Sequence, residues 1–298
     1  MTDAPGTAGR AVIVLSSHVV RGTVGNRAAV FALETLGLPV WAMPTVILPW
    51  HPGHGRATRI VPPAGEFSAL VDDLCAAPWL GEVGAVLSGY LGGPEQAEAV
   101  ARLVGAVKAR NQGALYLCDP VMGDAGGLYV PEATAAAMRD LLVPLADIAT
   151  PNRFELEWLA GAALPDNSAA ARAALRLGPP TMLVTSAHAL MAGSIGNLLV
   201  TDREAVLAEH RAVPDAPHGT GDLISALFLA RLMTGQSAAK ALQTATAAVF
   251  EVLARAVKRG ADELMLETDA QSLARPMAMV QMRRLVHPDA GPEGGRRA

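Results

Sequence analysis

The segment HGTGD, residues 218–222, stands directly before the apolar run LISALFLARLM, which predicts a helix over Gly221–Met233. Two glycines at a helix start leave backbone N–H groups uncovered, and together with the helix dipole these groups bind an anion. A carboxylate beside them can take the proton of a hydroxyl group while the N–H groups stabilise a phosphoryl group in transfer. The segment therefore indicates phosphoryl transfer to an alcohol, with Asp222 as the base. The anion site would be formed by Gly219, Thr220 and Gly221. In the alternative interpretation, Asp222 only stabilises the helix N-terminus.

Two further carboxylates occur in a loop after the predicted strand Ala114–Cys118. Asp119 and Asp124 are five residues apart, and Pro120 and Gly123 interrupt any regular structure between them. Mg²⁺ is held in proteins by one or two carboxylates together with waters and substrate phosphates, so this pair suits a Mg²⁺–phosphate complex. The alternative is a helix-capping aspartate and a turn aspartate, with no ligand.

The segment TPNRFE, residues 150–155, follows the predicted strand Asp147–Ala149. Asn152 and Glu155 have the spacing of a capping box at a helix N-terminus, which is a purely structural interpretation. The same two side chains would also lie at the sheet edge that carries Asp119 and Asp124. Thr185 and Ser186 place hydroxyl groups after a fourth strand, and alone they indicate little.

The predicted strand Ala11–Leu15 is followed by the polar segment SSHVVRGTVGN. Only Gly22 and Gly25 occur there, so the GxGxxG fingerprint of a dinucleotide site is absent. The glycines can be explained by a tight turn alone. Because several polar residues gather at a strand end, we favour a small-molecule pocket lined by Ser17 and the loop backbone.

These residues require a sheet whose strands end at one edge. Short apolar runs alternate with helical stretches along the chain, which predicts an α/β fold with a doubly wound, mostly parallel sheet between two helix layers. Ligands bind such sheets beyond the carboxyl ends of the strands. The segments 196–201 and 205–210 predict a hairpin, and a long helix over Ala238–Arg259 predicts a packing element. The other predicted strands are Val40–Leu48, Ala85–Leu87 and Met182–Val184, and the other predicted helices are Asn26–Leu36, Phe67–Ala76, Glu95–Arg110, Glu132–Leu142, Phe154–Ala160 and Ala169–Leu177.

Composition excludes several classes of protein. The chain has 298 residues, 51% hydrophobic and 17% charged, so a large core is expected and disorder is excluded. The formal net charge is −4, so no basic surface indicates nucleic acid as a partner. Only Lys108, Lys240 and Lys258 are lysines, and no Gly-Lys-Ser/Thr element occurs, which rules out a P-loop. Cys75 and Cys118 are too few for a disulfide framework and show no metal spacing.

The chain shows no targeting or membrane signal. Its first residues lack the basic and apolar regions of a secretory signal, and the uncharged stretch 177–201 is interrupted by prolines and glycines. We therefore expect a cytoplasmic protein without a membrane partner. We expect a flexible N-terminus over 1–10, one domain over 11–285 and a disordered tail over 286–298.

Five motifs in order resemble the pyridoxal kinases of the ribokinase superfamily. They are SSHVVRGTVGNRAAVFALETLG, LSGYLG, ALYLCDPVMGD, PLADIATPNRFELEWLAG and HGTGDLISALFLARL, and the resemblance runs from about residue 11 to 257. It implies a ribokinase-like kinase domain that uses ATP and Mg²⁺ to phosphorylate the 5′-hydroxymethyl group of pyridoxal and related B6 vitamers. It also implies a monovalent cation such as K⁺ and a cytoplasmic homodimer.

The resemblance implies roles for single residues. Asp222 would be the base and Gly219–Gly221 the anion site. The substrate-binding residues would be Ser17, Val24, Pro52, Gly53, Tyr90, His218 and Asp222. The nucleotide and the monovalent cation would be held by Asp119, Thr150, Asn152, Glu155, Thr185 and Ser186, and Mg²⁺ by Asp124 and Glu155.

The chain departs from the family pattern in the segment expected to cover the substrate. It has PWHPGHG at residues 49–55 where relatives carry S-N-H-T-G/Q-Y-G. Pro52 replaces a threonine and has neither a hydroxyl nor an N–H group. His54 replaces an aromatic residue, and His218 replaces a small apolar one. Stacking or hydrogen bonding of these histidines to an aromatic substrate and a merely solvated loop both stay open, and both are favoured over a zinc site at His51 and His54. Packing of Trp50 over the ring is a further hypothesis.

Two other functions stay open at this point. The altered segment would also suit a kinase of the same fold for hydroxymethylpyrimidine or another small alcohol. A non-catalytic vitamer-binding module is the third hypothesis, although a binding module needs neither a base nor an anion site.

Overall fold

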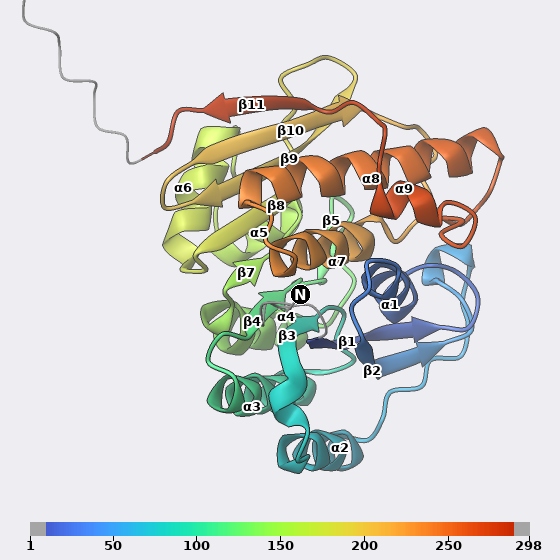
Figure 1. Cartoon of the computed structure of the whole chain (residues 1–298), viewed down its shortest axis with the longest axis vertical. Coiled ribbons are helices and arrows are strands. Elements are labelled where there is room, and N and C mark those ends of the chain that lie inside the picture. The colour runs from blue at the N-terminus through green and yellow to red at the C-terminus, as the bar shows by residue number, and fades with distance from the viewer. Residues whose placement is uncertain (1–9, 289–298) are drawn as a thin grey trace, which may run out of the picture.

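The apolar runs form one nine-stranded sheet in a computed structural model that describes residues 10–288. The strand order is β11-β10-β9-β8-β7-β4-β3-β1-β2, parallel from β2 to β8 and antiparallel from β8 to β11 (Figure 1). The strands of this sheet are β1 (Ala11–Val19), β2 (Val40–Leu48), β3 (Val83–Ser88), β4 (Leu115–Cys118), β7 (Ile148–Ala149), β8 (Thr181–Ala187), β9 (Ser194–Thr201), β10 (Ala205–Arg211) and β11 (Gln281–Leu285). The strands β5 (Gly123–Asp124) and β6 (Gly127–Leu128) form a separate small ribbon.

Helices cover both faces of the sheet, which confirms the predicted three-layer α/β fold (Figure 1). Residues of β1 alternate between the two faces: Val12 and Val14 pack into the core under one helix layer, and Ile13 and Leu15 into the core under the other. The first layer holds α1 (Asn26–Thr35), α7 (Thr220–Met233), α8 (Ala238–Lys258) and α9 (Ala270–Ala274). The second layer holds α2 (Ala64–Ala76), α3 (Pro94–Arg110), α4 (Glu132–Ala137), α5 (Arg153–Ala160) and α6 (Asn167–Leu177).

Several elements differ from the prediction. Strand β1 continues to Val19, because Ser17 and His18 pair with β2 beyond a register shift between Ser16 and Ser17. The predicted helix over 132–142 ends as α4 at Ala137 and continues as a wider π-turn, and Pro144 cannot extend a regular helix. The strands β5, β6 and β11 and the helix α9 were not predicted. The hairpin β9–β10 and the packing helix α8 are confirmed.

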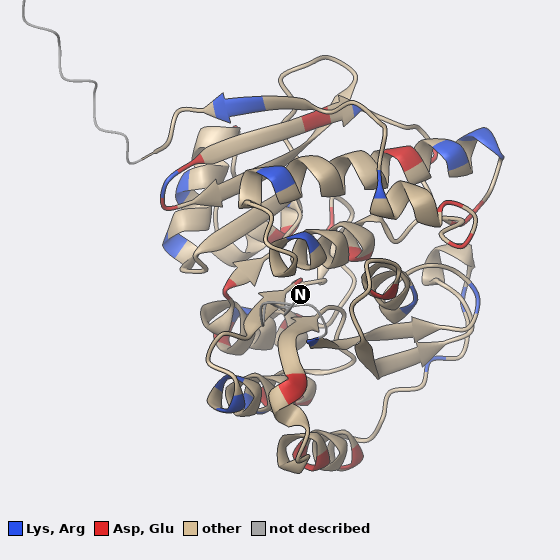
Figure 2. Cartoon of the chain, viewed as in Figure 1, with Lys and Arg blue, Asp and Glu red and all other residues tan. Residues whose placement is uncertain are grey.

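The first strand of the sheet, β1, begins at Ala11, and the last, β11, ends at Leu285, while the single domain expected over 11–285 stays a prediction. The expected flexible terminus over 1–10 and disordered tail over 286–298 lie outside the described residues, apart from Arg10 and 286–288. In the latter segment, His287 Nε2 lies 2.9 Å from the carbonyl oxygen of Thr201. Among residues 10–288, no helix has the length and apolar character needed to cross a bilayer. Lysines and arginines are interspersed with acidic residues over the view in Figure 2.

Helix α7 is the most deeply buried helix of the first layer, and Phe228 within it has no exposed surface. We expect Phe228→Ala to lower the free energy of unfolding by about 3–5 kcal/mol, because it leaves a cavity between α7 and the sheet. Urea denaturation measures this loss. Leu190→Ala, at a side chain that is 60% exposed, is the control and should change stability by less than about 0.5 kcal/mol. Equal losses in both variants would contradict the central position of α7.

Candidate functional site

The register of the parallel strands brings the polar residues after each strand to one edge. Gly89 donates to Leu15 O (2.8 Å), Asp119 to Ser88 O (2.8 Å) and Thr150 to Cys118 O (3.0 Å) through their backbone N–H groups. Each of these three residues directly follows its strand, so the hydrogen-bond ladder continues one step past the sheet. The result is a row of polar side chains at the carboxyl edge, as expected for a doubly wound fold.

This row forms the floor of a cleft with a volume of about 680 Å³. Every site residue predicted above lines it except Gly53: Ser17, Val24, Pro52, Tyr90, Asp119, Asp124, Thr150, Asn152, Glu155, Thr185, Ser186, His218, Gly219, Thr220, Gly221 and Asp222. Gly53 lies beside the cleft, where its N–H group donates to His51 Nδ1 at 3.0 Å. The structure therefore brings the predicted residues together, while their individual roles stay predictions.

The N-terminus of α7 is packed against the loop that joins β1 to α1. Gly219 has a φ of 94°, and a side chain on it would collide with the carbonyl oxygen of Thr23. Gly25 has a φ of 57°, and a side chain there would collide with Ser17. Both positions therefore need glycine, because the conformation and the close backbone approach leave no room for a Cβ atom.

Asp222 lies in the first turn of α7 and accepts hydrogen bonds from its own N–H group and from that of Gly25. Burial in the cleft raises the pKa of this carboxyl to about 6, and the two hydrogen bonds limit the rise because they favour the charged form. A carboxyl with this pKa is mostly ionised at neutral pH and can still accept a proton. The geometry thus places a carboxyl with a pKa suited to a general base beside a helix N-terminus of the kind that binds anions, and both roles stay predictions.

A buried hydroxyl that the sequence analysis missed joins two strand ends. Ser225 Oγ lies 3.0 Å from the carboxylate of Asp119 and 2.8 Å from the hydroxyl of Thr150. Ser225 follows Asp222 by three residues on α7, so both side chains face the sheet edge. That i, i+3 spacing was the available signal, and the apolar run around Ser225 concealed it.

Asn152 and Glu155 form the predicted capping box of α5. The Asn152 side chain accepts from the Glu155 N–H group (2.9 Å), and the Glu155 carboxylate accepts from the Asn152 N–H group (2.8 Å). The box also holds the neighbouring loop, because Glu155 accepts from Met122 N–H (3.0 Å) and Asn152 donates to the carbonyl of Gly123 (2.7 Å). Capping and a position in the cleft therefore coexist. Burial raises the pKa of Glu155 to about 7, although these backbone donors oppose the rise.

The cleft concentrates negative charge. Burial raises the pKa of Asp119 well above its usual range, and the nearby carboxylates of Glu155 and Asp222 raise it further. Asp124 and the phenol of Tyr129 lie in the same cleft, and burial together with these carboxylates raises the pKa of Tyr129. Within residues 10–288, Arg59 is the only lysine or arginine that lines the cleft. This excess of carboxylate oxygens fits cations that arrive with a ligand.

No metal-binding group is complete by itself. In the described part of the chain, no set of three or more His, Cys, Asp or Glu side chains is arranged to hold a metal ion. That geometry suits Mg²⁺, which takes one or two carboxylates and fills its shell with water and phosphate oxygens. His51 and His54 do not point to one ligand site, since His51 stacks on His218 and His54 contacts Glu263.

One end of the cleft is covered by the turn Pro52–His54, which follows β2. The rings of His51 and His218 are stacked, with centroids 3.9 Å apart and an interplanar angle of 28°. Burial, with His218 and His54 nearby, lowers the pKa of His51 to about 4, so its ring is neutral near pH 7. Trp50 is 37% exposed and its indole N–H group donates to the carbonyl of Gly55 (3.2 Å), so packing of Trp50 over a ligand stays a hypothesis.

The opposite end of the cleft is more apolar and was largely missed by the sequence analysis. Val213, Val249 and Leu253 line it together with Asn197 and His210. These residues come from β9, β10 and α8 and from the segment after β10, far from any polar motif, and only the fold brings them together. Ser186, at the border of the two ends, has a φ of 52°, which is unusual for a residue with a side chain.

Comparison with known proteins gives consistent matches. The family model for phosphomethylpyrimidine kinase matches residues 73–267. The chain is 41% identical over 281 residues to the pyridoxal kinase PdxY of Rubrobacter xylanophilus, covering 92% of this chain and 97% of that protein. It is 37% identical to PdxY of Granulibacter bethesdensis, with 89% and 96% covered. A solved pyridoxal kinase from Leishmania donovani in complex with ADP and pyridoxamine superposes with a TM-score of 0.87 at 28% identity, covering 93% of this chain and 99% of that one.

The raised pKa of Asp222 predicts a stability cost that depends on pH. The folded state disfavours the ionised form of the Asp222 carboxyl. The free energy of unfolding therefore falls as the pH rises from about 4 through about 6. Asp222→Asn removes this loss, so the variant should be more stable than the parent protein by about 1–3 kcal/mol at pH 8, and the difference should vanish toward pH 4. Urea denaturation across this range measures it. Asp202→Asn, at a side chain that is 80% exposed, serves as the control. A difference that does not change with pH would contradict the assignment.

Proposed function

Because the chain belongs to the pyridoxal kinase family, we propose that it transfers the γ-phosphoryl group of ATP to the 5′-hydroxymethyl group of pyridoxal and related B6 vitamers. One observation carries the proposal: the carboxylate of Asp222 lies beside the Gly219–Gly221 N-terminus of α7, inside a cleft that also holds Asp119, Asn152 and Thr185. A base next to an anion site is what phosphoryl transfer to an alcohol requires.

In this mechanism, Asp222 accepts the proton of the 5′-hydroxyl group as the substrate oxygen bonds to the γ-phosphorus. The bond from the γ-phosphorus to the bridging oxygen breaks, and ADP leaves with the electron pair of that bond. A pKa of about 6 keeps Asp222 ionised at neutral pH, so it is ready to take the proton. The hydrogen bond from Gly25 N–H orients the carboxylate toward the cleft.

Backbone N–H groups at the start of α7 stabilise the charge on the phosphoryl group in transfer. Gly219 and Gly221 carry no side chain that would cover these N–H groups. The loop between β1 and α1 packs against this helix end, with the carbonyl oxygen of Thr23 next to Gly219. The phosphates are thereby bound without a P-loop lysine. Thr185 and Ser186 add hydroxyl donors from the end of β8.

The acidic residues fit the cations that ATP brings. Asp124 is available for Mg²⁺. The carboxylate oxygens of Glu155 already accept hydrogen bonds from backbone N–H groups, so Glu155 would act on Mg²⁺ through water or by fixing the loop 122–124. Mg²⁺ would supply neutralisation of phosphate charge. Asp119 and Thr150, with Thr185 in the same cleft, suit a monovalent cation such as K⁺. The reason is that Asp119 is a buried carboxylate whose charged neighbours, Glu155 and Asp222, are both acidic.

The two ends of the cleft suit the two substrates. Ser17, Val24 and Tyr90 would contact the pyridine ring, with Pro52 and His218 above it. Asn152 would contact the nucleotide phosphates, and the apolar end formed by Val213, Val249 and Leu253 would take the adenine base. We further propose that the enzyme is a cytoplasmic homodimer, as the resemblance to its family implies.

Phosphorylation of hydroxymethylpyrimidine is the second candidate function. The family model that matches residues 73–267 carries the description phosphomethylpyrimidine kinase, which names a related pyrimidine. In addition, Pro52 removes a hydroxyl expected to contact a B6 vitamer. Both substrates present a hydroxymethyl group on a flat nitrogen heterocycle, so the same base and anion site would serve either.

A coupled assay of ADP formation distinguishes these functions. We expect ATP consumption that depends strictly on added vitamer, with kcat/KM for pyridoxal at least about tenfold above that for hydroxymethylpyrimidine, because discrimination between similar rings is worth about 1–3 kcal/mol. Pyridoxine and pyridoxamine complete the comparison. A preference for the pyrimidine would favour the second candidate. Vitamer binding without any ADP formation would indicate a non-catalytic binding module.

Asp222→Asn tests the base directly. The variant should lose a factor of about 10²–10⁴ in kcat, because an amide cannot accept the proton, while its fold and vitamer binding are kept. Initial rates at saturating substrates measure this, and Asp202→Asn is the matched control at the surface. Turnover near that of the parent enzyme would remove Asp222 from the mechanism.

A further inference from the structure

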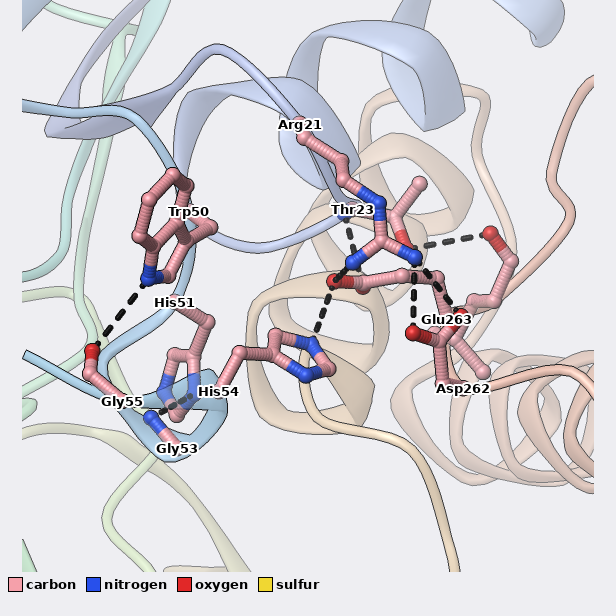
Figure 3. Close-up of polar contacts among 10 residues, drawn as sticks. Arg21, Thr23, Trp50, His51, Gly53, His54, Gly55, Asp262 and Glu263 are labelled. Carbon is pink, nitrogen blue, oxygen red and sulfur yellow. Dashed lines mark hydrogen bonds and ion pairs between the residues drawn. The ribbon is translucent and has the colours of Figure 1, made fainter.

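The carboxylate of Glu263 connects two walls of the cleft that are far apart in the sequence. Glu263 lies in the segment between α8 and α9 and does not line the cleft itself. Its Oε2 accepts from the N–H group of Thr23 at 3.2 Å, and its Oε1 lies 2.9 Å from Nε2 of His54 (Figure 3). The side chain of Glu263 is only 13% exposed.

The first wall is the loop between β1 and α1. It carries Val24 into the cleft, and the hydroxyl of Thr23 donates to the carbonyl of Leu264 at 3.1 Å, so this loop is held at two points by the same segment. Gly22 leaves the space that the carboxylate fills, because a Cβ atom there would lie 2.5 Å from Glu263 Oε1.

The second wall is the covering turn Pro52–His54. Its backbone hydrogen bonds are local, from His54 to His51 and from Gly55 to Pro52. Beyond these, the turn is tied to the cleft through the stacking of His51 on His218 and through the contact of His54 with Glu263. The Glu263 carboxylate therefore holds the covering turn and the β1–α1 loop at a defined separation.

Charged side chains surround this contact. The Glu263 carboxylate faces His54 directly, and Asp262 lies next to Glu263 and pairs with Arg21 at 2.7 Å (Figure 3). The guanidinium of Arg21 also lies 3.9 Å from the carboxylate of Glu263. Glu263 is therefore held from the side of the β1–α1 loop while it contacts the covering turn.

We propose that Glu263 is a positioning residue for the vitamer site, which fixes the covering turn through its contact with His54 and so makes vitamer binding tighter. The inference rests on the proposed kinase function, because it concerns the same cleft. It assigns no chemical step to Glu263 or His54. The predicted effect therefore falls on KM for the vitamer and not on kcat.

The test compares Glu263→Gln and His54→Gln with the parent enzyme at saturating ATP. Each variant should raise KM for pyridoxal by about 3–10-fold while kcat stays within about twofold, since a single partly buried hydrogen bond contributes a modest amount. The double variant should lose no more than either single one, because both remove the same contact.

Two further variants separate positioning from general damage. Glu267→Gln changes an exposed carboxylate in the same segment and should leave KM unchanged. His54→Tyr keeps a hydrogen-bond donor toward Glu263, so it should restore a low KM. Calorimetric titration with pyridoxal in the absence of ATP should give the same ratios for Kd, independently of turnover.

Each outcome decides one question. Unchanged KM and Kd in both glutamine variants of an active parent enzyme would overturn the positioning role and leave the kinase function intact. A fall in kcat alone would also overturn it. A parent enzyme that consumes no ATP with any vitamer would instead refute the proposed function. If Glu263→Gln does not fold, His54→Gln carries the test, since His54 lies in an exposed turn.

Discussion

The cleft holds more negative charge than the side chains around it can neutralise. Burial raises the pKa of Asp222 and of Glu155, and the nearby charge of Asp124 adds to the rise at Glu155. At Asp119, repulsion from Glu155 and Asp222 adds to the effect of burial. Such an arrangement costs stability, and the two apolar cores on either side of the sheet must offset that cost. In the proposed mechanism, this charge favours ligands that carry cations with them, and Asp222 serves as a base whose pKa of about 6 lies below neutral.

The same constraint explains how a triphosphate can be bound by a chain with three lysines. In the proposed mechanism, positive charge in the cleft would come from helix N-termini and from the cations of the ligand. Arg59 is the only lysine or arginine among the described residues that line the cleft. Helix N–H groups do not move and need no counter-ion, so they can approach the buried carboxylate of Asp222 closely. A lysine at that place would pair with Asp222 and lower its pKa, which would make it a weaker base.

The sheet edge could be predicted because each short apolar strand is followed at once by its polar residues, and parallel strands end together. The prediction failed where tertiary contacts override local pattern. Ser17 and His18 look like a loop but pair with β2, and Ser225 is hidden in an apolar run yet hydrogen bonds Asp119. The polar strand β11 forms only because β10 offers it an open edge. The apolar end of the cleft has no local signal, since its residues are gathered from separate elements.

The covering turn shows why the departures from the family pattern have to be interpreted together. Pro52 removes a donor, but it also rigidifies the turn that carries Gly53 against the ring of His218, where a side chain would come within 2.6 Å of Nε2. His218 in turn stacks on His51, which is neutral and accepts from Gly53 N–H. The contacts among His51, Gly53 and His218 thus hold the turn in a defined shape, although Pro52 stands where relatives carry a threonine. In the proposed site, flat rings would therefore contact the substrate in place of the threonine hydroxyl, and shape would become the stronger basis of selection.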